Sequence, residues 1–270
     1  MEGRRSSDEG EERGSLGFTD IWMREKHHLL YSKATHHPFI LSISNGTLHI
    51  SSFKRWLGQD YLFVRQFIPF VASILIKSWK EAVDNSDMDL ILSGLASLND
   101  EISWFKKEAS KWDIVLSDII PQESNQDYSR FLESLTNSEI DYPVVLTALW
   151  AIEVVYQESF SLCLKDDSKT PPELLEACHR WGNEEFKQYC CLLQRTTDRY
   201  LEKAPINVVA KAEEVFVRVL ENEVKFWNMS YDVFALHMIV KSVRNETFYS
   251  LCECLAANHV MFRMYTARPF

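Results

Sequence analysis

The sequence predicts an all-α protein folded as a single-domain helical bundle. Apolar side chains recur at helical spacing through most of the chain. No segment alternates apolar and polar residues as a half-buried strand does. The composition, 46% hydrophobic with only 8 Gly and 8 Pro in 270 residues, agrees with a large apolar core and few turns.

Charged residues, a proline and a glycine turn divide the N-terminal part of the chain into its predicted elements. Residues 1–17 are charged and rich in Gly and Ser, and we expect a disordered tail that is neither a signal peptide nor an anchor. From residue 18 to residue 37 the pattern is that of one helix, which Pro38 and the turn Asn45-Gly46 interrupt. Ser51 or Ser52 is then expected to cap the next helix.

The remaining elements are helices separated by short loops. Pro69 is expected to kink the helix that begins near Ser51 or to end its first half. Further helices are predicted over residues 70–83, 87–113, 124–138, 141–165, 172–203 and 207–230. Pro143 suits the first turn of its helix, and Gly182 is expected to interrupt another. The role of the apolar segment 231–270 is not predicted.

Charge and cysteine spacing exclude several classes of function. A net charge of −10 and a pI near 5.3 argue against a nucleic-acid partner, which needs a clustered basic surface. No run of about 18 uncharged apolar residues is present, so we expect no membrane-spanning segment. The six cysteines lack the spacing of zinc or redox sites, which predicts reduced thiols and a cytoplasmic protein.

An acidic residue, Asp60, lies within the apolar stretch RWLGQDYLFVRQFIPF. Its helical neighbours at i−4, i−3, i+3, i+4 and i+7 are Trp56, Leu57, Phe63, Val64 and Phe67. An unpaired carboxylate is costly to bury, so a carboxylate on an apolar face implies a hydrogen-bond partner, a raised pKa or a ligand that supplies donors.

Two other helices each turn one acid inward. Glu153 is flanked by Leu149, Trp150 and Tyr156, and Glu223 by Phe216, Val219, Leu220, Phe226 and Trp227. Each acid could be a core carboxylate satisfied by a Tyr or Trp donor. Together they could also form one polar pocket with aromatic walls, suited to a flat ligand rich in N–H donors.

Metal binding is the competing use of these acids. A carboxylate-bridged di-iron bundle carries two Glu-x-x-His pairs, whereas this sequence has one, Glu176 with His179. We therefore predict no metal site and no cofactor.

Four segments in the same order resemble the TenA family, in its plant branch called TENA-E, known as seed maturation proteins. These are HPFILSISNGTLHISSFKRWLGQDYLFVRQF, WAIEVVYQESF, RWGNEEFKQY and ENEVKFWNMS. The resemblance runs from about Thr19 to Ser230. It implies a haem-oxygenase-like, all-α fold without haem, and a role in thiamin salvage on the aminopyrimidine moiety.

The resemblance also implies site residues. The family's pyrimidine-binding aspartate falls on Asp60, its catalytic glutamate on Glu223, and two stacking aromatics on Phe63 and Trp181. Tyr156 or Tyr128 would donate a hydroxyl hydrogen bond, and Trp56 on the Asp60 face completes the predicted substrate-binding residues, which are Asp60, Phe63, Tyr128, Tyr156, Trp181 and Trp56.

The sequence departs from the cysteine-containing branch of the family at Ala148, where that branch has its nucleophile. Cys163 lies about 15 Å from Glu153 by helix rise, which is too far for its thiol to replace the missing nucleophile. The Cys-less branch carries Glu153 instead. The resemblance implies hydrolysis of formylaminomethyl-pyrimidine and then of aminomethyl-pyrimidine to hydroxymethyl-pyrimidine. We expect direct water attack with Glu153, Glu223 and Asp60 as catalytic residues. Glu153, alone or with Glu223, would orient and deprotonate the water, and Glu223 would protonate the leaving nitrogen.

Two other functions stay open, a non-catalytic pyrimidine-binding or interaction protein and a carboxylate-bridged metal oxygenase. The expected partners are a small aminopyrimidine and further copies of the chain, as a homo-oligomer and most simply a dimer. Residues 18–230 are expected to form the TenA-like domain. The family usually stops soon after the position of Ser230, so 231–270 is a C-terminal extension.

Overall fold

The computed structural model describes residues 16–81 and 85–231. By its internal contacts the chain divides into a unit of residues 1–230 and a second unit of residues 231–270, and all the elements below belong to the first. Its helices are α1 (Phe18–Ile21), a π-helix (Trp22–Lys26), α2 (His28–Thr35), α3 (Pro38–Ser44), α4 (Ile50–Glu81), α5 (Asn85–Lys111), α6 (Glu123–Leu135), α7 (Tyr142–Leu162), α8 (Leu175–Gly182), α9 (Glu184–Leu201) and α10 (Ile206–Ser230), with short 3-10 turns at Leu116–Asp118 and Pro172–Leu174. The described residues contain no strand, which confirms the predicted all-α class.

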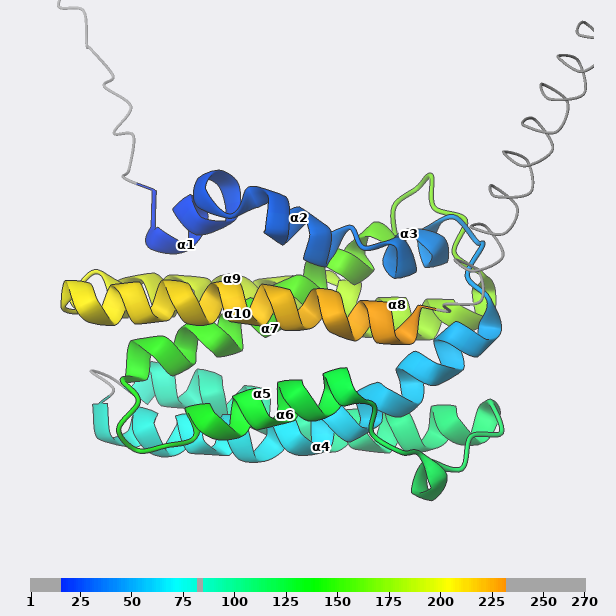
Figure 1. Cartoon of the computed structure of the whole chain (residues 1–270), viewed down its shortest axis with the longest axis horizontal. Helices are drawn as coiled ribbons and strands as arrows, with labels where there is room; N and C mark the ends of the chain where they lie inside the picture. Colours follow the sequence, from blue (N-terminus) through cyan, green and yellow to red (C-terminus); the bar gives the residue numbers. More distant parts are fainter. Residues whose placement is uncertain (1–15, 82–84, 232–270) are drawn as a thin grey trace, which may run out of the picture. The chain divides into compact units, whose positions relative to one another are not determined.

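The helices of the first unit pack around α7, which is buried along most of its length. Helix α7 contacts α8, α9 and α10 as well as α2, α3 and α4. Figure 1 shows α7, α9 and α10 together on one side of α4, α5 and α6, with α1 to α3 beyond them. Residues from α4, α5, α7 and α10 therefore share one interior, in which a polar site can be enclosed.

Short-range signals fix several helix ends as the sequence predicts. His37 caps α3, since its imidazole accepts a hydrogen bond from the Phe39 N–H at 3.1 Å, and Pro38 occupies the first turn. Gly46 has φ +69°, which confirms the predicted turn after α3. The interruption predicted at Gly182 is confirmed, because α8 ends at Gly182 and α9 begins at Glu184. A Cβ at Gly182 would lie 2.7 Å from the Phe160 carbonyl, so this close approach requires glycine.

Two boundary predictions near the N-terminus are wrong. The helix predicted from residue 18 to residue 37 is divided by a π-turn, in which the His27 N–H donates to the Trp22 carbonyl at 2.9 Å. Ser51 and Ser52 lie inside α4 and do not cap it from outside. His49 takes that role, since its Nδ1 accepts from the Ser51 N–H at 3.3 Å.

The prediction that Pro69 could end a helix is also wrong, because α4 continues through it to Glu81. Proline removes one backbone hydrogen bond and disfavours a helix interior by about 3 kcal/mol. Buried residues on both sides, Phe67, Phe70 and Val71, hold the helix in place, so tertiary packing overrides the local preference.

Helix α4 is, among the described residues, the one helix long and apolar enough to cross a membrane by length and composition. Of its most apolar 18-residue window, 44% is buried inside the fold. Core helices pass the same test. Most of the predicted tail, residues 1–15, and nearly all of the predicted extension, residues 232–270, lie outside the described residues.

The turn between α6 and α7 is held by a buried lysine from α4. The Lys77 ammonium donates to the backbone carbonyls of Asn137, Ser138 and Ile140 at 2.9, 3.0 and 2.9 Å. The side chain is 8% exposed, so these carbonyls replace the water that would otherwise solvate the ammonium.

We expect Lys77→Met to lower the free energy of unfolding by about 2–4 kcal/mol, since it removes three hydrogen bonds from a buried ammonium to part-buried backbone carbonyls. Lys80→Met, three residues along α4 at an exposed position, is the matched control. Urea denaturation of the two variants and the wild type measures the difference. Equal midpoints for both variants would contradict the structural role of Lys77.

Candidate functional site

One small cavity in the first unit brings together most of the predicted site residues. Its lining comprises Asp60, Phe63, Val64 and Phe67 of α4, Leu98 and Glu101 of α5, Ile152, Glu153 and Tyr156 of α7, and Trp181 of α8. The free volume is about 20 Å³. That is room for about one water molecule, so the cavity is narrow and its polar groups lie close together.

Asp60 is buried, at 1% exposure, as its apolar helical neighbours predict. Its Oδ1 accepts a hydrogen bond from the Tyr156 hydroxyl of α7 at 2.7 Å. Its Oδ2 has no hydrogen-bond partner within the described part of the chain. Burial raises the pKa of Asp60 well above its usual value, and the Tyr156 hydrogen bond opposes that shift.

Glu223 on α10 has the same half-satisfied arrangement. Its Oε1 accepts from the Tyr128 hydroxyl of α6 at 2.6 Å, while Oε2 has no partner among the described residues. Burial raises the pKa of Glu223 to about 8, and the Tyr128 hydrogen bond limits the rise. Both acids thus keep one oxygen unpaired in the interior.

Glu153 and Glu101 form the other acidic wall of the cavity. Burial raises the pKa of Glu153 well above its usual value, and the negative charges of Glu101 and Glu223 raise it further. Burial raises the pKa of Glu101 to about 7, while the Arg180 charge and a hydrogen bond from Trp181 lower it. At neutral pH Glu101 is therefore partly ionised.

Glu101 lines the cavity, although the sequence analysis did not predict it as a site residue. Its neighbours at i−3, i+3 and i+4 on α5 are Leu98, Trp104 and Phe105, all buried. The same periodicity that singles out Asp60 would have found it, but α5 is rich in charged residues on its other faces.

The predicted aromatic residues divide between the cavity wall and the layer behind it. Phe63 and Trp181 line the cavity, and Phe63 also packs on Tyr128 with ring centroids 4.8 Å apart. Trp56 is fully buried and meets the edge of Trp181 at 5.7 Å, without lining the cavity. Trp56, Tyr128 and Glu223 are not among the lining residues, although the charge of Glu223 acts on Glu153 in the cavity wall.

The cysteine considered from the sequence as a nucleophile and the Glu-x-x-His pair considered as metal ligands do not line the cavity. Cys163 is buried, and its thiol approaches the Ile40 carbonyl at 3.8 Å outside the cavity lining. Glu176, of the single Glu-x-x-His pair, accepts from the Trp104 indole at 3.2 Å and from Lys107 at 3.3 Å. In the described ranges no three His, Cys, Asp or Glu side chains are arranged as metal ligands.

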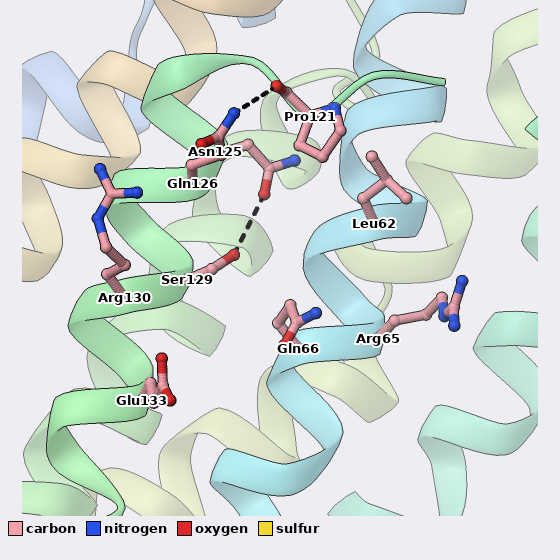
Figure 2. A pocket seen from close by; sticks show the side chains of 9 residues that line it. All are labelled: Leu62, Arg65, Gln66, Pro121, Asn125, Gln126, Ser129, Arg130 and Glu133. Carbon is pink, nitrogen blue, oxygen red and sulfur yellow. Dashed lines mark hydrogen bonds between the residues drawn. The ribbon is translucent and has the colours of Figure 1, made fainter. Parts of the chain in front are cut away.

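A wider pocket of about 390 Å³ opens between α4 and α6, away from the acids. Figure 2 shows its polar lining, in which Gln126 donates to the Pro121 carbonyl at 2.8 Å and Ser129 donates to Asn125 at 3.5 Å. None of the predicted site residues lines it. It contains none of the buried, half-satisfied acids, so we do not assign it as the site.

Known proteins with similar sequences point to one family. The chain is 57% identical over 219 residues to a probable bifunctional TENA-E protein of Glycine max, covering 81% of this chain and 95% of that protein. It is 25% identical over 207 residues to an aminopyrimidine aminohydrolase of Helicobacter pylori, covering 72% of this chain and 90% of that enzyme.

The fold comparison agrees. The crystal structure of a TenA homologue from Pyrococcus furiosus matches with a TM-score of 0.72 at 22% identity, covering 79% of this chain and all of that one. This confirms the predicted TenA-like helical fold. The model of the TENA/THI-4/PQQC family matches residues 24–233, and the chain therefore belongs to that family.

Proposed function

We propose that the protein is a thiamin-salvage hydrolase that acts on the pyrimidine moiety, first as a formylaminomethyl-pyrimidine amidohydrolase and then as an aminomethyl-pyrimidine aminohydrolase. The observation that carries the proposal is the pair of buried acids, Asp60 and Glu223, each with one oxygen unpaired beside an aromatic-walled cavity. Similarity to an aminopyrimidine aminohydrolase and to a TENA-E protein supports this substrate class.

Asp60 binds the ring in this proposal. Its unpaired Oδ2 accepts from the amino group of the pyrimidine, while Tyr156 holds Oδ1. Phe63 and Trp181, from different helices, stack on the ring. A pyrimidine is far larger than the single water that the cavity accommodates, so side chains of the wall move apart when it binds.

Glu101 and Glu153 hold the attacking water. Glu101 takes its proton, because its pKa of about 7 leaves it partly ionised at neutral pH. Glu153, whose pKa is raised well above its usual value by burial and by the charges of Glu101 and Glu223, orients the water or the substrate. This division places the base on Glu101 and gives Glu153 a positioning role.

Glu223 supplies the proton to the leaving nitrogen, with Tyr128 fixing its orientation. In the first step the water oxygen bonds to the formyl carbon, the C–N bond breaks, and formate and the amine are released. In the second step water bonds to the methylene carbon and ammonia leaves, giving hydroxymethyl-pyrimidine. Neither step uses a cysteine nucleophile, in agreement with Ala148 at the family's thiol position.

We further propose that the protein works in the cytoplasm as a homo-oligomer, most simply a dimer, without nucleic acid or a membrane as partner. The free thiols of Cys163, Cys178, Cys190 and Cys191 support a reducing compartment. The net charge of −10 supports the exclusion of nucleic acid.

The first test compares Glu101→Gln and Glu153→Gln with the wild type on formylaminomethyl- and aminomethyl-pyrimidine. We expect product from the wild type and about a 100-fold or larger loss of kcat in Glu101→Gln, since general bases contribute that much. Glu153→Gln should lose less, because a neutral amide can still orient a water. Release of formate and ammonia is measured by coupled assay.

Two outcomes would change the proposal. Binding of both pyrimidines by the wild type without any product would favour a non-catalytic pyrimidine-binding protein, in which the acids only recognise the ring. A greater loss in Glu153→Gln than in Glu101→Gln would return the base to Glu153.

Glu223→Gln tests the acid. We expect kcat to fall by about 100-fold or more while pyrimidine binding, measured by calorimetry, persists. Glu221→Gln, two residues away on the same helix, is the matched control, because Glu221 is only half-buried and lines a separate pocket with His27 and Glu213. Unchanged turnover in Glu223→Gln would remove the acid role.

The pH dependence follows from the two pKa values. Glu101 must be ionised, so activity rises as pH increases through about 7. Glu223 must be protonated, so activity falls as pH increases through about 8. We expect a narrow bell-shaped profile of kcat/KM with its maximum between these values. A profile flat from pH 6 to pH 9 would contradict both assignments.

A further inference from the structure

A second pocket, of about 240 Å³, lies between α5, α8 and α9 and is not used by the mechanism above. Its lining is Ser93, Gly94 and Ser97 of α5, Arg180 of α8, and Asn183, Glu185, Phe186 and Tyr189 at the start and first turns of α9. Glu185 is exposed. The pocket thus carries the Arg180 guanidinium and one exposed carboxylate, whereas the acid cavity is lined by three carboxyl groups.

Two of these donors are buried and unpaired. The Tyr189 hydroxyl and the Arg180 Nε have no hydrogen-bond partner among the described residues. Tyr189 reaches α5 at Gly94, where a Cβ would overlap its hydroxyl. The Arg180 guanidinium is held over the rings of Trp104 and Trp181, 5.3 and 5.9 Å from their centroids. Buried donors without acceptors are uncommon and indicate a missing acceptor group.

The pocket adjoins the acid cavity along α5 and α8, and Tyr189 of α9 lies near the carboxyl groups of that cavity. Ser97 is four residues, about 6 Å of helix rise, from Glu101 on α5. Arg180 lines the pocket, and the next residue, Trp181, lines the cavity. Besides burial, the charges of Glu153 and Glu101 raise the pKa of Tyr189, so its hydroxyl lies within the field of both carboxylates.

We propose that this pocket is an acyl-oxygen subsite, in which Tyr189 Oη–H and Arg180 Nε–H donate to the carbonyl oxygen of an N-acylated aminomethyl-pyrimidine. The inference rests on the proposed function and deepens it, because it assigns the residues that select the formamide over the free amine. The acids accept from N–H groups, whereas these two donors require an acceptor, and the formyl oxygen is the acceptor that the formamide has and the amine lacks. The same donors hold formate after the amide is cleaved.

Tyr189→Phe is the main test, because it removes the hydroxyl and keeps the ring. We expect kcat/KM for the formamide to fall at least tenfold more than kcat/KM for the amine. Gly94→Ala should also lower the ratio of kcat/KM for the formamide to kcat/KM for the amine, since its Cβ displaces the Tyr189 hydroxyl without removing it. Arg180→Lys keeps the charge near Glu101 and should also lower the ratio, whereas Arg195→Lys, exposed on α9, should leave it at the wild-type value.

Formate serves as the second probe. Competitive inhibition of amide hydrolysis by formate should weaken at least tenfold in Tyr189→Phe. Equal losses on both substrates, with formate inhibition unchanged, would overturn the subsite. Failure of the wild type to hydrolyse either substrate would instead contradict the proposed function. Thermal melts of the variants separate a loss of fold from a loss of selectivity, since only a specific subsite changes the ratio in a folded protein.

Discussion

The burial of four carboxyl groups in one apolar interior is the constraint on which the site depends. An isolated charge cannot be taken out of water cheaply, so burial shifts the pKa values of Asp60, Glu101, Glu153 and Glu223 upward. The tyrosines satisfy one oxygen each of Asp60 and Glu223 and leave the other unpaired. This half-satisfied state is stable only while the helices hold the donors in place, and it leaves acceptors for a ligand.

The aromatic layer is what keeps those helices in place. Trp181 of α8 contacts Trp56 of α4, Phe160 of α7 and Trp104 of α5 at ring separations of 5.7, 5.2 and 5.3 Å. Each contact joins two elements that carry an acid or line its cavity. The high tryptophan content therefore has a structural role, which is to position the polar groups, as well as supplying the cavity wall.

Much of this could be predicted from the sequence, because helical periodicity is a local signal. Asp60 and Glu223 are recognisable by their apolar neighbours, and Gly182 by its place between two helices. The tyrosine partners are not, since they lie 96 and 95 residues from their acids and depend on how separate helices dock. Glu101 carried the local signal but belongs to a helix whose polar faces obscure it. The continuity of α4 through Pro69 also depends on tertiary packing.

The opposite polarity of the two adjoining pockets gives the proposed two-step hydrolysis a physical basis. The acid cavity presents acceptors to the amino and methylene-amine nitrogens, which both substrates share. The pocket beside it presents the donors of Arg180 and Tyr189, which only an acyl oxygen can use. Cleaving the amide removes the group that binds the donors and leaves the amine held by the acids. One site can then perform both hydrolyses in order, because the first product keeps its contacts with the carboxyl groups while formate departs.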